Sequence, residues 1–77
     1  MFIEQVIEDA KTMDPKPGFI TTFRYILDLP YTSEQINDMV AELSIERPDL
    51  TFFSHFGEEY TVPYFYIQGI QKQRANV

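Results

Sequence analysis

The chain has 77 residues, no cysteine and a formal net charge of −6 at pH 7. This length suits one domain, and the missing cysteines exclude a disulfide framework, a cysteine-based zinc site and a redox thiol. The acidic balance argues against binding to nucleic acid or to an anionic membrane surface.

One domain over residues 1–77 is therefore expected, with an ordered core over 1–70 and a frayed tail over 71–77. No apolar run has the length of a membrane span, and the first residues lack the basic start of a signal peptide. These features predict a cytoplasmic protein. The aromatic fraction is high, at 16%, so a few buried rings can provide most of a small core.

The spacing of apolar residues predicts an amphipathic helix over residues 2–13. Its apolar side would carry Phe2, Ile3, Val6, Ile7, Ala10 and Met13. Residues 14–18 should end this helix, because neither proline there can continue it and Gly18 permits a turn.

Residues 19–27 alternate with a period of two and are rich in β-branched and aromatic residues, which predicts a strand. One face would carry Phe19, Thr21, Phe23, Tyr25 and Leu27, and the other Ile20, Thr22, Arg24 and Ile26.

A second helix should begin after Thr32, which together with Gln35 makes a capping box. Tyr31 and Ile36 occupy the positions of a hydrophobic staple. The helix should end before Pro48, because the residue that precedes a proline disfavours the helical region. The predicted buried stripe is Ile36, Met39, Val40 and Leu43.

Residues 50–56 and 60–67 are aromatic-rich runs that predict a β-hairpin, with its turn at residues 57–59. Pro63 would lie on an edge strand, at a bulge or where pairing begins. The element order is therefore α-β-α-β-β. It predicts an α+β fold in which a β-α-β crossover and the C-terminal hairpin make a three-stranded mixed sheet packed by two helices.

Catalytic and metal-binding patterns are weak. Ser54 and His55 are adjacent on a strand and point to opposite faces, so they cannot work as nucleophile and base. Glu58 and Glu59 lie at an exposed turn, where nothing separates their pKa values. We expect no enzyme, no metal and no other cofactor, and we interpret His55 as a solvent-facing residue.

Four acids recur every four residues on the second helix, opposite its apolar stripe: Glu34, Asp38, Glu42 and Glu46. We call these residues the acid ridge. Like charges at this spacing destabilise a helix slightly, and no lysine is interleaved. The ridge is either a solvated helix face or a surface complementary to a basic partner.

The strands contain more large rings than one sheet face can bury. Alternation places Phe53, Tyr64 and Tyr66 opposite the most apolar positions of their strands. Either both faces are covered, or exposed rings mark an interface.

The sequence hypothesis is a non-enzymatic acidic protein-binding module, such as a small regulator or phage-type inhibitor. The acid ridge would engage a basic and possibly nucleic-acid-binding protein surface, while Phe53, Tyr64 and Tyr66 provide apolar anchoring. The alternative is a structural or assembly protein that forms a homodimer or larger homo-oligomer through its aromatic sheet face or an edge strand.

Overall fold

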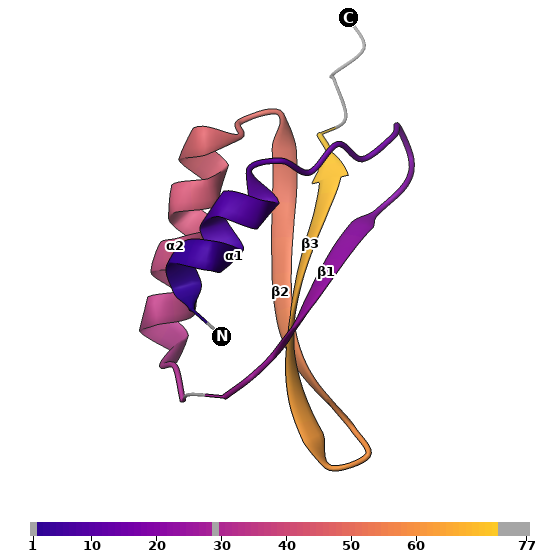
Figure 1. Cartoon of the computed structure of the whole chain (residues 1–77). Coiled ribbons are helices and arrows are strands. Elements are labelled where there is room, and N and C mark those ends of the chain that lie inside the picture. Colours follow the sequence, from indigo (N-terminus) through magenta and orange to yellow (C-terminus); the bar gives the residue numbers. More distant parts are fainter. Residues whose placement is uncertain (1, 29, 73–77) are drawn as a thin grey trace, which may run out of the picture.

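The computed structural model describes residues 2–28 and 30–72. Along the chain these residues form α1 (Ile3–Ala10), β1 (Thr21–Ile26), α2 (Ser33–Glu46), β2 (Leu50–Glu59) and β3 (Val62–Gln71). Both helices pack against the same face of a three-stranded sheet (Figure 1). The predicted α+β class and element order are confirmed. Neither described helix is long and apolar enough to cross a membrane.

The prediction of a mixed sheet was wrong. β3 lies between β1 and β2, and it pairs with both of them in the antiparallel direction. β1 and β2 run parallel to each other but do not pair, so the crossover through α2 skips one strand. The helix-facing residues of this central strand, Phe65 and Ile67, are fully buried.

The second helix begins as the sequence predicts. Thr32 Oγ1 accepts the Gln35 N–H at 3.1 Å, and Gln35 Oε1 accepts the Thr32 N–H at 2.9 Å, which completes the capping box. The helix ends at Glu46, before Pro48. The first helix is shorter than expected, since it ends at Ala10 rather than near residue 13.

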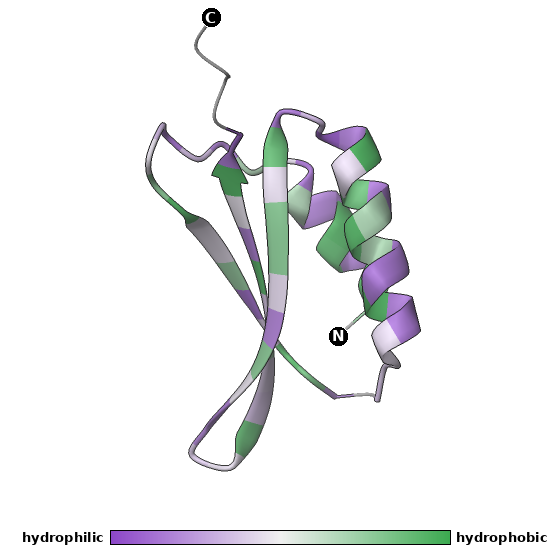
Figure 2. Ribbon diagram, turned by 180° about the vertical axis from the view of Figure 1, so that it is seen from behind, coloured by the Kyte–Doolittle hydropathy of each residue, from purple (hydrophilic) through white to green (hydrophobic). Residues whose placement is uncertain are grey.

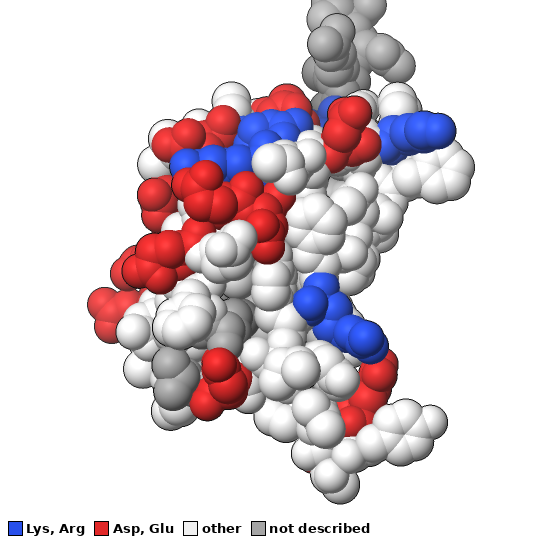
Figure 3. Space-filling model, in the orientation of Figure 1, with Lys and Arg blue, Asp and Glu red and all other residues white. Residues whose placement is uncertain are grey.

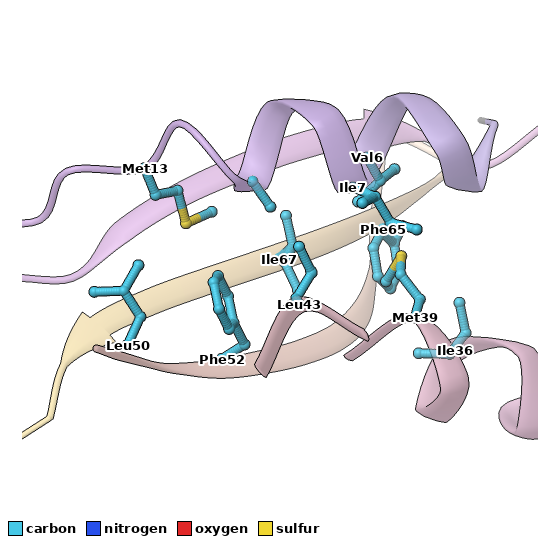
Figure 4. Close-up of a cluster of buried hydrophobic side chains, with 11 residues drawn as sticks. Val6, Ile7, Met13, Ile36, Met39, Leu43, Leu50, Phe52, Phe65 and Ile67 are labelled. Carbon is cyan, nitrogen blue, oxygen red and sulfur yellow. The ribbon is translucent and has the colours of Figure 1, made fainter. Parts of the chain in front are cut away.

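The core lies between the helices and the sheet (Figures 2 and 4). Its buried apolar residues come from both helices, from the loop after α1, and from β2 and β3. They are Val6, Ile7, Ala10, Met13, Ile36, Met39, Leu43, Leu50, Phe52, Phe65 and Ile67. Most of the two predicted stripes is buried, but Ile3 and Val40 are only partly buried and Phe2 is exposed.

Arg47 holds the ends of the two helices together. One nitrogen, Nη1, donates to the carbonyls of Lys11 and Met13, each at 2.7 Å. Nε and Nη2 form a bidentate pair with Asp49, at 3.0 and 2.9 Å. The same pair holds the pKa of the Asp49 carboxyl below its usual range and raises the pKa of Arg47. This side chain supplies donors to backbone carbonyls that follow α1.

The hairpin turn lies later than predicted. Gly57 is inside β2, paired with Tyr64, and the two turn residues are Tyr60 and Thr61. Both have positive φ, at 51° and 65°, as a type I′ turn requires. Pro63 stands where the pairing of β3 begins, and its carbonyl accepts the Leu27 N–H at 2.9 Å. The hairpin consequently projects beyond the helices (Figure 1).

The end of the described chain is tied to the sheet. Gln71, which we expected in the frayed tail, is the last residue of β3, and its Nε2 donates to the Pro15 carbonyl at 2.9 Å. The Lys72 N–H donates to the Asp49 carbonyl. Residues 73–77 lie outside the described residues.

Candidate interaction surfaces

The acid ridge lies on the side of α2 that faces water. Its four members, Glu34, Asp38, Glu42 and Glu46, are all exposed. None of them forms an ion pair with another residue in the described ranges. Figure 3 shows acidic side chains gathered over the two helices. Since four residues turn a helix by about 400°, the ridge drifts by about 40° at each step. Of its members, Glu42 lies beside residues of α1.

A groove of about 260 Å³ opens where the ridge meets α1. Its carboxylates are Glu4 and Glu8 from α1 and Glu42 from α2. Ile3 and Ile7 provide apolar surface between them. The groove therefore combines an aliphatic lining with acidic groups at its rim.

Three cations of the described chain already have carboxylate partners. Lys11 lines the groove, but its Nζ pairs with Glu8 at 3.3 Å. Arg47 is held by Asp49 and by the carbonyls after α1. Arg24 lies on the opposite face of the sheet, where it pairs with Glu59 at 3.0 Å. Glu4 and Glu42 form no ion pair with another described residue.

The second surface is the sheet face that no helix covers. Phe53, Tyr64 and Tyr66 lie on this face, as alternation predicted, because their strand neighbours Phe52 and Phe65 enter the core. Phe53 is 51% exposed, and both tyrosines are half-buried.

Contacts that the sequence did not reveal organise these rings. His55 stacks on Tyr66 with ring centroids 4.7 Å apart. The Arg24 guanidinium lies 4.6 Å from the centre of the Tyr64 ring while it pairs with Glu59. The Tyr66 hydroxyl donates to the same Glu59 carboxylate at 3.3 Å. Cross-strand register creates all three contacts, and register is not visible before the pairing is known.

Gly57 makes room for the Tyr66 ring. A Cβ at this position would stand 2.8 Å from Tyr66 Cε2, which is closer than carbon atoms approach one another without a shift. The glycine that we expected in the turn therefore serves ring packing on the open face.

The structure does not bring the two predicted parts of the site together. The acid ridge lies on the helix layer, and Phe53, Tyr64 and Tyr66 lie on the other side of the sheet. A single flat partner surface cannot contact both. The two sets of predicted residues therefore form two separate surfaces.

His55 is exposed on the open face, where it contacts a tyrosine ring rather than a nucleophile. Within residues 2–28 and 30–72, no cluster of three or more histidine, aspartate and glutamate side chains could hold a metal ion. The Tyr25 hydroxyl donates to Asp9 at 2.8 Å. Burial, helped by that hydrogen bond, raises the pKa of the Tyr25 phenol.

No protein family, no curated protein and no solved structure matches this chain. A functional interpretation therefore rests on the two surfaces themselves.

Proposed function

We propose that the chain is a non-enzymatic protein-binding module that contacts a basic protein surface through the acidic face of its helices. The observation that carries this proposal is the groove between α1 and α2, where Glu4 and Glu42 form no ion pair with another described residue. The ridge residues Glu34 and Asp38 extend the same charge along α2.

The groove fits the chemistry of a lysine or arginine side chain. Such a side chain has an apolar stem and a charged head. It binds most tightly where the stem contacts apolar surface and the head meets a carboxylate. Ile3 and Ile7 would contact the stem, and Glu4 and Glu42 would accept hydrogen bonds from the head. An arginine would form the stronger contact, because its guanidinium can bind a carboxylate in a bidentate way.

Binding to a basic protein surface suggests a role for the chain as a competitor of nucleic acid. A basic protein surface often serves to hold nucleic acid, and an acidic module that occupies it would compete with that ligand. The chain would then act as a small regulator or inhibitor, as the phage-type hypothesis states. The proposal places this encounter in the cytoplasm.

Phe53, Tyr64 and Tyr66 have a separate place in the proposal. Because they face away from the helices, they would contribute apolar anchoring only to a partner that reaches around the sheet, or to a second partner. Removing these rings should leave the contact with the helix face intact.

The test is affinity capture from the cell that expresses the chain, with two charge-reversed variants. Glu42→Lys alters the groove, and Glu58→Lys makes the same change in net charge at an exposed hairpin position away from the helices. Partners captured by the unaltered chain and by Glu58→Lys should be lost with Glu42→Lys. Their affinity should fall about tenfold, and it should fall further as salt is added.

Two outcomes would count against the proposal. Partners that bind equally well to both variants would show that the ridge is only a solvated helix face. Partners whose affinity does not change with salt would show that charge complementarity is not the basis of recognition.

A further inference from the structure

β1 is an edge strand, and one row of its backbone groups is not paired with any other described strand. The Leu27 N–H donates to the Pro63 carbonyl of β3, and hydrogen-bonding direction alternates along a strand. Thr21, Phe23 and Tyr25 therefore bond to β3. The N–H and C=O groups of the intervening residues, Thr22, Arg24 and Ile26, point away from the sheet. In Figure 1 no helix or strand of the described chain lies beyond this side of β1.

Of the features that normally prevent strand addition, this edge has one charged side chain, Arg24, and its guanidinium is paired with Glu59 of the same chain. The edge strand contains no proline and no lysine, and its pairing with β3 runs without a bulge from Thr21 to Ile26. Apolar side chains stand exposed at both ends of the strand. Ile20 is 56% exposed and Ile26 is 59% exposed, which leaves apolar surface in water beside free hydrogen-bonding groups.

A groove runs along the same edge. It has a volume of about 370 Å³ and is lined by Asp9 and Thr12 from the α1 side and by residues 22–25 of β1. Phe23 lies in this groove, half-buried on the helix side of the sheet. An added strand would find backbone partners at the edge and an aromatic ring beside them.

We propose that the occupant of this edge is β1 of a second copy of the chain, added antiparallel about a two-fold axis. The argument is self-complementarity. If Phe23 of one chain pairs with Phe23 of the other, Ile20 of each chain lies opposite Ile26 of its partner. Thr22 then lies opposite Arg24. The exposed isoleucines then cover each other, and the outward backbone groups pair in the same register.

Neighbouring symmetric registers are worse. A shift of the pairing by two residues in one direction sets Arg24 against its own copy and Ile20 against Asp28, so like charges meet and an isoleucine faces an acid. A shift in the other direction centres the pairing on Thr22 and leaves Ile26 without an apolar partner. The register that matches Ile20 with Ile26 is the one that the side chains favour.

Formation of this dimer should depend on salt in the opposite way to binding of a basic partner. The two-fold axis puts both helix layers on the same side of one continuous sheet, and each chain has a net charge of −6. Added salt screens this repulsion, so association should tighten as ionic strength rises. The proposed contact with a basic partner should weaken under the same conditions, and the two proposals can therefore fail independently.

Sedimentation equilibrium on the full chain tests the inference. The 9.1 kDa chain should behave as a dimer at micromolar concentration, and more so at high salt. Ile20→Lys and Ile26→Glu should each raise the dimer dissociation constant about tenfold, because a two-fold interface contains each change twice. Ile45→Lys, at an exposed isoleucine on α2, is the matched control and should leave association unchanged.

The register is tested by mixing the two edge variants. An equimolar mixture of Ile20→Lys and Ile26→Glu should form heterodimers more tightly than either variant associates alone. In that heterodimer the new lysine meets the new glutamate, and the remaining isoleucines still face each other. Both positions are exposed, so each variant should fold. Circular dichroism would confirm that it does.

Three results would overturn the proposal. The first is a monomer at every concentration and salt level. The second is a dimer that tolerates both edge variants as well as it tolerates Ile45→Lys. The third is a mixture of edge variants that associates no better than its components.

Discussion

The two faces of the domain handle charge in opposite ways. On the open sheet face, the charged pair Arg24 and Glu59 is neutralised locally and serves to position tyrosine rings. On the helix face, most acids of the ridge and of α1 point to water without a partner in the described chain. The sheet face therefore has an organised, nearly neutral aromatic surface, and the helix face has a field that extends into solution.

This contrast separates two kinds of recognition within one small domain. The electrostatic field of the acidic face acts at a distance and accelerates the encounter with a basic partner, but salt screens it. An aromatic surface acts only on contact, and salt affects it little. Salt dependence is accordingly the measurement that assigns any binding event to one face or the other.

The largest expected effect compares two neighbouring residues on β2 that lie on opposite faces. Phe52 is 6% exposed and Phe53 is 51% exposed. Phe52→Ala should lower the free energy of unfolding by about 3–4 kcal/mol, because it leaves a cavity in the core. Phe53→Ala should cost about 1 kcal/mol or less, because much of that ring is already in water. Urea unfolding of both variants would measure the difference, and equal losses would contradict a one-sided core.

The second effect tests what holds the helix layer together. Arg47→Ala should lower the free energy of unfolding by about 2–3 kcal/mol, since the Lys11 and Met13 carbonyls lose a charged donor. Arg47→Lys is the control. It keeps the charge but cannot reproduce the fork, so it should recover only a small part of the loss. Full recovery by lysine would mean that charge alone matters at this position.

The third effect concerns the turn of the hairpin, which projects beyond the helices. Tyr60 and Thr61 adopt positive φ values that glycine and asparagine tolerate better. Replacing them by Asn-Gly should raise the free energy of unfolding by about 1–2 kcal/mol. The Tyr60 ring is 97% exposed, so no packing is lost. Thermal unfolding of the double variant gives the answer, and a lower melting temperature would refute this interpretation.

The smallest effect lies where α1 meets β1. The pKa of Tyr25 is raised by burial and by its bond to Asp9. A group whose pKa is higher in the folded state contributes stability below its unfolded pKa, about 10 for tyrosine, and loses it as pH rises. Tyr25→Phe should cost about 1 kcal/mol at neutral pH. It should also flatten the alkaline loss of stability, as measured by urea unfolding across that range. An unchanged slope would exclude this role for Tyr25.

Local signals in the sequence were sufficient for the start of α2 and for the faces of the strands, but they misplaced the end of α1 and the hairpin turn by a few residues. The capping box of Thr32 and Gln35 positions the start of α2 through bonds that span three residues. The alternation along β2 and β3 placed Phe53, Tyr64 and Tyr66 on the open face, because a strand reverses its side chains at each step. The positions of the acid ridge follow from helical period in the same way.

Only the tertiary structure decided how these segments meet. Either edge of the hairpin could have paired with β1, and in the folded domain β3 does so and lies in the centre. The role of Gly57 depends on a ring from another strand, and the role of Arg47 on carbonyls more than thirty residues away in the chain. Period and capping act over a few residues and determine each element, whereas strand order, register and long-range hydrogen bonds exist only after the elements have packed.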